Sequence, residues 1–423
     1  MQIHGTVRVP GDKSITHRGL LFGALARGRT HIGGALTSLD ARSTARVLRQ
    51  LGVTISPLGP DRLVTVQGRS RFRRPEGRLH CGNSGTTTRL LLGLLAAHRF
   101  RATLTGDASL RRRPMRRVTA PLVAMGATVT AGPADGLPLE ILGGRLRPLR
   151  HELPVASAQL KSALLLAGVA GGVEVALREP APTRDHTERL LRAFGYTLET
   201  RDGWLHFAPT GRLEPFDLQV PGDPSSAAFL VGAAALAEGG ELRLTGVGLN
   251  PTRTGFLAIV GRMGAAVHVE AGADQVGEPV GDLIARPAAL RATDVSPREV
   301  AGAIDEIPLL AVLAARAEGT TRFRDCGELR VKESDRLALM AENLRTVGVE
   351  AEVQGDDLLV TGTDAPPVGP VRTAGDHRIA MAFAVLGTVP GARIRVDDPA
   401  CAAVSFPGFH DLLRSVRAPA RRA

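Results

Sequence analysis

An internal repeat constrains the fold of this chain more than any other feature of its sequence. Residues 9–34 and 220–245 both begin with the letters VPGD and align without a gap. Each copy reads as the end of a strand, a Gly-Asp turn, a serine-containing cap, an apolar helix and a glycine stop. Because repeated sequences form repeated local structures, the chain is predicted to be built from related α/β units.

The same order of signals recurs elsewhere in the chain. Further units begin at residues 82–85, 157–159, 304–306 and 375–378, and each leads into a helix rich in alanine and leucine. A second helix then ends before a glycine that opens an aliphatic strand, and these glycines are Gly52, Gly126, Gly195, Gly264 and Gly348. The sixth unit has no such glycine, so we expect the strand at residues 3–9 to complete it.

The repeat also predicts the domain organisation. A chain of 423 residues is too long for one ordinary core, so six units are expected to form two domains of three units each. The chain is predicted to cross between the domains near Asp12 and Asp223, which gives a continuous domain over 13–221 and a second domain made of 1–12 plus 222–423. Hairpin-like pairs, such as the segments around Thr128 and Leu139, indicate mixed sheets rather than a doubly wound sheet.

The positive charge of the chain is carried almost entirely by arginine. The formal net charge is +11, yet the 53 basic residues include only three lysines, Lys13, Lys161 and Lys332. Lysine can lose its proton when its surroundings lower its pKa, whereas arginine effectively cannot. Lys13 and Lys332 lie in polar motifs, whereas Lys161 lies within a helical pattern and is predicted to be structural.

Charge of this size is compatible with binding of nucleic acid or of anionic small molecules, and an arginine-rich composition bias also contributes to it. The arginines are spread along the chain and aromatic residues make up only 3%, which favours an anionic small substrate over nucleic acid. There is no apolar run of membrane-spanning length and no signal-peptide pattern at the N-terminus. Cys81, Cys326 and Cys401 lack the spacing of a disulfide framework or metal site, so we expect a cytoplasmic protein without a metal, and a monomer.

Five polar segments are candidates for binding and catalysis. They are residues 11–18 (GDKSITHR), 82–89 (GNSGTTTR), 110–117 (LRRRPMRR), 329–336 (LRVKESDR) and 375–378 (GDHR). Most lie at predicted helix starts, where unpaired N–H groups and the helix dipole favour phosphate and carboxylate. The fourth crowds carboxylates against cations, which suits acid–base chemistry. Each segment alone could also be a capped, solvated helix or a surface ion-pair patch.

Taken together, these segments resemble the enolpyruvylshikimate-phosphate synthases. GDKSITHR, GNSGTT, the RRP of the arginine-rich loop, ELRVKESDRL and DHRIAM are hallmark segments of that family and occur in its order over essentially the whole chain. SAQLKSA, TRDHTE and VSFP resemble its second class. The resemblance implies an inside-out α/β barrel fold of two globular domains, each of three βαβαββ units. It also implies transfer of the enolpyruvyl group of phosphoenolpyruvate to the 5-hydroxyl of shikimate 3-phosphate, without a cofactor.

The resemblance assigns roles to particular residues of this chain. Lys13 would contact both substrates. Shikimate 3-phosphate would be held by Ser14, Arg18, Ser157, Gln159, Arg184, Asp305 and Lys332. Phosphoenolpyruvate would be held by Gly85, Arg113, Gln159, Arg336 and Arg378. Asp305, Glu333 and Lys13 would carry protons, with Asp305 as the base toward the hydroxyl. Ala158 stands where some members have a second serine, so the phosphate site is expected to depend more on Arg184.

A related family, the UDP-N-acetylglucosamine enolpyruvyl transferases, shares the implied fold and the phosphoenolpyruvate substrate. Its members typically carry a cysteine on the loop that corresponds to Gly106–Pro114, and this loop has none. Their opening motif has Lys-Asn where this chain has Lys13-Ser14. Both differences favour the shikimate 3-phosphate family.

Gly85 bears on inhibition by glyphosate, the phosphoenolpyruvate-like inhibitor of the resembling family. Many second-class members tolerate it, and tolerant members often carry alanine at this position. Because this chain has glycine there, we expect inhibition that competes with phosphoenolpyruvate.

Overall fold

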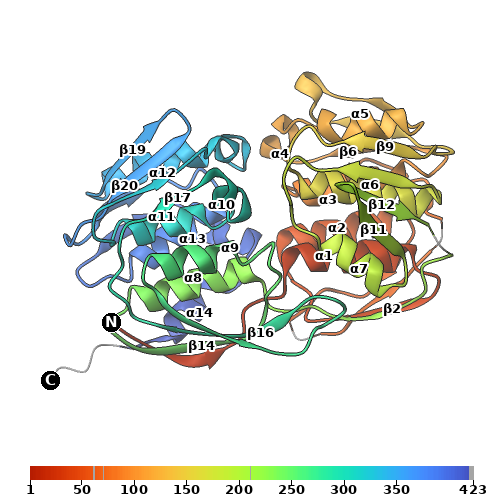
Figure 1. Ribbon diagram of the computed structural model, residues 1–423. Coiled ribbons are helices and arrows are strands. Elements are labelled where there is room, and N and C mark those ends of the chain that lie inside the picture. The colour runs from red at the N-terminus through yellow and green to blue at the C-terminus, as the bar shows by residue number, and fades with distance from the viewer. Residues whose placement is uncertain (61, 70, 210, 419–423) are drawn as a thin grey trace. The chain divides into compact units, whose positions relative to one another are not determined.

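The computed structural model describes residues 1–60, 62–69, 71–209 and 211–418, and these residues form two compact units (Figure 1). Domain A consists of residues 11–220 together with 274–278, and domain B of residues 1–10, 221–273 and those from 279 onward. Residues 274–278, which the sequence division places in the second domain, therefore pack with domain A.

Domain A contains three repeat units. The first comprises α1 (Lys13–Leu25), β2 (Arg29–Gly33), α2 (Leu39–Gln50), β3 (Thr54–Ile55) and β4 (Val64–Gln67). The second comprises β5 (Leu79–His80), α3 (Gly85–Leu95), β6 (Arg101–Thr105), α4 (Ala108–Arg112), α5 (Arg116–Ala124), β7 (Thr128–Thr130), η1 (Pro133–Asp135) and β8 (Leu139–Leu142). The third comprises β9 (Leu149–Glu152), α6 (Ala158–Gly171), β10 (Val175–Arg178), α7 (His186–Ala193), β11 (Thr197–Arg201) and β12 (Trp204–Ala208), and β13 (Asp217–Gln219) follows.

Domain B repeats this order of elements. Its first unit comprises α8 (Pro224–Ala235), β14 (Gly239–Gly248), α9 (Gly255–Arg262), β15 (Ala266–Ala271) and β16 (Val280–Arg286). The next comprises β17 (Asp294–Val295), α10 (Pro297–Gly302), α11 (Ile307–Ala314), β18 (Thr320–Phe323), η2 (Gly327–Val331), α12 (Arg336–Thr346), β19 (Glu350–Gln354) and β20 (Asp357–Thr361). The last comprises β21 (Val368–Val371), α13 (His377–Leu386), β22 (Arg393–Val396), η3 (Pro399–Val404), α14 (Phe409–Ser415) and β23 (Arg417–Ala418), and the N-terminal strand β1 (Gln2–Val7) also belongs to this domain.

The sheets are mixed, as predicted. In the order β5-β6-β8-β7 the first two strands run parallel, and the remaining pairs are antiparallel. The sheets β13-β2-β4-β3, β9-β10-β12-β11 and β17-β18-β20-β19 have the same pattern. A parallel pair needs a crossover connection, which helices supply between β5 and β6, between β9 and β10 and between β17 and β18.

The glycines that mark the repeat share one backbone conformation. Gly52, Gly126, Gly195, Gly264 and Gly348 all have φ between 85° and 115°. Each follows a helix end by two residues and precedes a strand by two. A side chain is disfavoured at such a φ, so glycine ends the helix and turns the chain into the strand.

The prediction that the N-terminal strand completes the sixth unit is correct only in part. Strand β1 pairs antiparallel with β23 of that unit at Gln2 and Ile3. Its main partner is β14, which runs parallel to it from Gln2 to Val7. Strand β13 pairs in the same way with β2. Each VPGD crossover therefore follows a strand that stays in the sheet of the domain that the chain is leaving.

The first helix of most repeat units lies inside its domain. In domain A, α3 packs against α6 and α1 (Figure 1), and in domain B, α8, α11 and α13 pack against one another. Every residue of α8 is buried, as a helix without polar side chains beyond its first turn requires. Helices inside and mixed sheets around them match the expected inside-out α/β architecture. Within the described residues, no helix has the length and apolar character to span a membrane.

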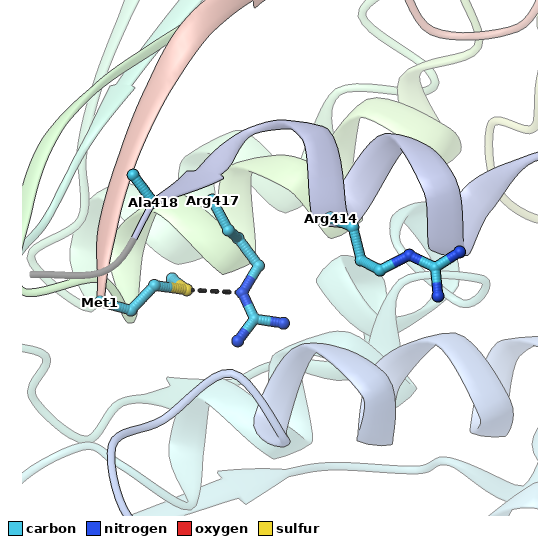
Figure 2. A pocket seen from close by; sticks show the side chains of 4 residues that line it. All are labelled: Met1, Arg414, Arg417 and Ala418. Carbon is cyan, nitrogen blue, oxygen red and sulfur yellow. Dashed lines mark hydrogen bonds between the residues drawn. The ribbon is translucent and has the colours of Figure 1, made fainter.

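A surface hollow lies beside Met1 and the last described residues of the chain. It is lined by Met1, Arg414, Arg417 and Ala418, and the Nε–H of Arg417 points to the sulfur of Met1 at 2.8 Å (Figure 2). Arg417 and Ala418 are the residues of β23 that pair with β1. The hollow contains none of the residues that the sequence predicts for the site.

Candidate functional site

The candidate segments 11–18 and 82–89 and the repeat-unit start at 157–159 lie at helix N-termini, as expected. The side chain of Asp12 caps α1 by accepting from the backbone N–H of Ile15 at 2.8 Å. Ser84 caps α3 and Ser157 caps α6 in the same way. The N-terminal N–H groups and the positive dipole end of these helices therefore lie at Lys13, Gly85 and Ser157, where they favour an anion.

Lys13 is held by a carboxylate that the sequence analysis did not single out. Its Nζ lies 3.3 Å from Oδ2 of Asp40, in the first turn of α2. Both side chains are largely buried, so Asp40 orients the ammonium of Lys13 even without a bound substrate. Asp40 lies 27 residues from Lys13, and no local pattern identifies such a pair.

Arg18 is buried and oriented by three hydrogen bonds within domain A. Its Nε–H donates to Oγ1 of Thr187 at 2.7 Å, and its terminal nitrogens donate to Oγ of Ser162 at 2.7 Å and to the carbonyl of Ser14 at 3.0 Å. Burial lowers the pKa of Arg18 to about 10, although nearby carboxylates, Glu188 first among them, oppose the shift. The guanidinium is thus a fixed cation at the start of the chain's first helix.

The glycine turn before α3 brings several predicted phosphoenolpyruvate residues together. Arg113 donates to Oδ1 of Asn83 at 2.6 Å, while the amide of Asn83 donates to Asp107 at 2.6 Å. Gln159 of α6 accepts from Arg89 at 2.6 Å. A methyl group on Gly85 would lie 2.9 Å from a nitrogen of Arg89 and 3.3 Å from one of Arg113, so both guanidiniums border this glycine.

Arg113 differs in burial from the other arginines of its loop. It is half-buried, whereas the remaining four, Arg111, Arg112, Arg116 and Arg117, are exposed. Arg89 was not predicted, although its place four residues after Gly85 puts both on one face of α3. Asn83 lies within the quoted glycine motif, but its role in orienting Arg113 depends on a contact across 30 residues.

Arg184 precedes α7, whose first turn is anchored by three buried contacts. Nδ1 of His186 lies 2.7 Å from Oε1 of Glu278, which belongs to the 274–278 segment of domain A. Thr187 contacts Arg18, and Oε1 of Glu188 lies 2.6 Å from Nζ of Lys161. The predicted residues Lys13, Ser14, Arg18, Gly85, Arg113, Ser157, Gln159 and Arg184 all belong to domain A.

The predicted residues of domain B form a second cluster around Arg336. Its Nε lies 2.8 Å from Oδ2 of Asp376, its NH1 lies 3.6 Å from Asp305, and its NH2 contacts Glu333. Arg336 is fully buried, and burial opposes its charge. The carboxylates of Asp376, Glu333 and Asp305 outweigh this effect and hold the pKa of Arg336 above its usual range.

Arg378 shares a carboxylate with this cluster. Its NH1 donates to the backbone carbonyl of Asp305 at 2.8 Å, and its NH2 lies 3.7 Å from the Asp305 carboxylate. Burial lowers the pKa of Lys332, while the charge of Asp305 opposes the shift. Asp305, Lys332, Glu333, Arg336 and Arg378 therefore lie in one electrostatic cluster of domain B. The carboxylate of Asp376 anchors Arg336.

The three cysteines lie outside both clusters and are poorly suited to chemistry. All are buried, and burial raises the pKa of Cys81 to about 11 and those of Cys326 and Cys401 to about 12. The thiolate is the reactive form, and it is scarce at neutral pH for such groups.

We therefore expect the Cys81→Ala, Cys326→Ala, Cys401→Ala variant to keep kcat/KM within about threefold of the unsubstituted enzyme, because only buried apolar contacts are lost. Circular dichroism and steady-state kinetics check this expectation. Loss of turnover in a correctly folded triple variant would instead indicate covalent cysteine chemistry.

The anchored cations at helix starts in domain A and the arginine–carboxylate cluster in domain B are each suited to binding anionic groups, as in enzymes that act on anionic substrates. The chain belongs to the EPSP synthase family (3-phosphoshikimate 1-carboxyvinyltransferase), whose family model matches residues 1–413.

Relatives of known name support this assignment over nearly the full length. A 3-phosphoshikimate 1-carboxyvinyltransferase of Thermus thermophilus is 51% identical over 97% of this chain and 96% of its own length. Its counterpart in Alkalilimnicola ehrlichii is 50% identical over 97% of this chain and 92% of its own. The solved EPSP synthase of Acinetobacter baumannii is 40% identical, with a TM-score of 0.87 over 98% of this chain and 96% of that one.

The fold extends to a more distant protein. The enolpyruvyl transferase NikO of Streptomyces tendae is 22% identical to this chain and superposes with a TM-score of 0.79, over 98% of this chain and 95% of its own. At this identity the similarity describes the fold alone. Repeat units of this kind thus persist where most side chains have changed.

Proposed function

We propose that this chain transfers the enolpyruvyl group of phosphoenolpyruvate to the 5-hydroxyl of shikimate 3-phosphate and releases phosphate. Membership of the EPSP synthase family supports this reaction. The observation that carries the residue roles is the contact of one buried guanidinium, Arg336, with both Asp305 and Glu333. Cations that bind an anionic substrate and carboxylates that move protons are thereby held at one place.

Domain A supplies the greater part of the proposed substrate contacts. Ser14, Arg18, Ser157, Gln159 and Arg184 would bind shikimate 3-phosphate, together with Asp305 and Lys332 of domain B. Gly85 and Arg113 would border phosphoenolpyruvate, and Arg336 and Arg378 would bind its charged groups. Lys13 would serve both substrates. Both are polyanions, so the anchored positive charges of Arg18 and Lys13 lower the cost of binding them.

The proposed chemistry needs one proton donor and one base. The methylene carbon of phosphoenolpyruvate gains a proton, and the shikimate 5-hydroxyl oxygen forms a bond to the adjacent carbon as its proton passes to a base. The tetrahedral intermediate then loses phosphate, and the methyl group returns its proton. Asp305 is the proposed base toward the hydroxyl, and Glu333 and Lys13 are the proposed proton carriers.

The same assignment leads to a proposal for the location, oligomeric state and partners of the enzyme. We propose that the enzyme acts in the cytoplasm as a monomer on two small-molecule substrates, without nucleic acid or a membrane as partner. The affinity of a nucleic-acid-binding protein would fall steeply with salt, and filter binding at several salt concentrations tests that alternative directly.

A coupled phosphate-release assay tests the proposed reaction. Phosphate should appear only when phosphoenolpyruvate and shikimate 3-phosphate are both present, because the leaving group departs only after the hydroxyl has added. Each substrate is omitted in turn, and a UDP-sugar replaces shikimate 3-phosphate in a further control. Release from phosphoenolpyruvate alone, or with the UDP-sugar, would overturn the proposal.

A further inference from the structure

The segment that carries Arg184 is an irregular loop between β10 and α7. It comprises residues 179–185, EPAPTRD, and contains no helix or strand. Pro180 and Pro182 restrict its backbone without supplying hydrogen-bond donors. Side-chain contacts at its two ends contribute to holding this loop in place.

Both ends of this loop are attached to one buried ammonium. Lys161 of α6 is 2% exposed, and its Nζ lies 2.7 Å from Oε2 of Glu179 and 2.6 Å from Oε1 of Glu188. Glu179 is the first residue of the loop, and Glu188 lies in the first turn of the helix that follows it. One cation thus joins the start of the loop to the helix at its end.

Glu179 connects Lys161 to Thr183, the residue that precedes Arg184. While its Oε2 contacts Lys161, its other oxygen, Oε1, accepts a hydrogen bond from the hydroxyl of Thr183. The carboxylate is therefore used at both oxygens, once toward the ammonium and once across the loop. Thr183 immediately precedes Arg184, so its bond determines the direction in which the chain enters that residue.

The residue type at position 161 fits this arrangement. Arginine occupies nearly every other cationic position of the chain, which has only three lysines among 53 basic residues. A compact ammonium can donate to two carboxylates that converge from different elements, whereas a planar guanidinium presents its donors in a rigid fork. Buried charge is retained where it is paired, and each charge here has a partner.

We propose that Lys161, Glu179 and Thr183 are positioning residues that hold Arg184 for the phosphate of shikimate 3-phosphate. The inference rests on the proposed function, in which Arg184 binds that phosphate. It adds three residues that act through Arg184 and do not contact the substrate themselves. It also gives the third lysine a role beyond packing within α6.

Thr183→Val is the sharpest test, because it removes one hydroxyl and leaves the three charges in place. We expect the KM for shikimate 3-phosphate to rise by about tenfold, the loss expected for a hydrogen bond to a charged group. The KM for phosphoenolpyruvate should stay within about twofold, because its proposed ligands lie on other elements. Thr183→Ser keeps the hydroxyl and should restore the KM for shikimate 3-phosphate.

Thr30→Val is a matched control in the same domain. Thr30 is fully buried, and its hydroxyl accepts from the backbone of Phe216 at 3.5 Å, away from the 179–185 loop. It should leave both KM values unchanged. Lys161→Met removes the centre of the arrangement and should raise the KM for shikimate 3-phosphate further, if the variant folds.

Hydrogen exchange separates a failure of this inference from a failure of the proposed function. Backbone amides of residues 179–188 should exchange faster in Thr183→Val than in the unsubstituted protein or in Thr30→Val. If the enzyme turned over neither substrate, this measurement would still decide whether the loop is held as described. Unchanged exchange, equal changes in both KM values, or no rescue by Thr183→Ser would overturn the inference.

Discussion

Lys13→Met is expected to reduce kcat by about 100- to 1,000-fold, the loss typical of removing one preorganised charge that stabilises a transition state. Lys13 opens α1, and Asp40 at 3.3 Å fixes its ammonium. Methionine keeps much of the side-chain length and apolar stem but cannot donate to substrate oxygens or carry a proton. Steady-state phosphate release measures the effect, with Arg101→Met, an exposed cation of the same domain, as the control.

The same substitution leaves Asp40 without its ammonium partner, and this structural effect must be separated from catalysis. Loss of a buried ionic partner is destabilising, so the melting temperature of Lys13→Met should fall. Adding Asp40→Asn removes the isolated charge and should restore much of the melting temperature without restoring turnover. Activity above a few per cent in Lys13→Met would refute the role assigned to this lysine.

Gly85→Ala is expected to raise the inhibition constant of glyphosate by about 30-fold, the equivalent of roughly 2 kcal/mol of overpacking. The added methyl group would lie 2.9 Å from Arg89 and 3.3 Å from Arg113, which are flexible ends that can shift by a few tenths of an ångström. Phosphoenolpyruvate is shorter than glyphosate and should tolerate that shift, with its KM rising about threefold or less. Competitive inhibition kinetics measure both constants.

Gly77→Ala provides the control, because a methyl group there meets no atom within 4 Å. It should change neither constant. Equal increases of the inhibition constant and the KM in Gly85→Ala would show that this glycine does not discriminate between the two molecules. A parent enzyme indifferent to millimolar glyphosate would refute the expectation that Gly85 leaves room for it.

Local sequence signals predicted the architecture because each repeat carries its own helix caps and its own glycine at a helix end. Gly52 and Gly348 lie almost 300 residues apart, yet both end a helix at a positive φ that favours glycine. Helix starts at Lys13 and Gly85 followed from their caps. The pairing of β1 with β14 was missed because it joins residues more than 230 positions apart, and a strand's own sequence does not specify its neighbour.

In the candidate site, too, local motifs could be read from the sequence and long-range contacts could not. Residues such as Arg113 and Asp305 could be proposed from the sequence because the family resemblance assigns roles to them. The residues that hold the site side chains in place were not predicted. Arg18 contacts Thr187 across 169 residues, and Arg113 contacts Asn83 across 30. Pairing of buried polar groups depends on tertiary contacts, so the sequence indicates which side chains are available but not which of them meet.

The short segment 274–278 limits how this protein could have been assembled from smaller genes. A polypeptide ending at residue 220 would contain His186 but lack Glu278, its buried partner at 2.7 Å. A polypeptide beginning at residue 221 would lack β1, an inner strand between β14 and β23. Neither domain is therefore encoded by one uninterrupted stretch, so recombination that exchanges a domain must carry along a distant fragment or leave a buried group unpaired.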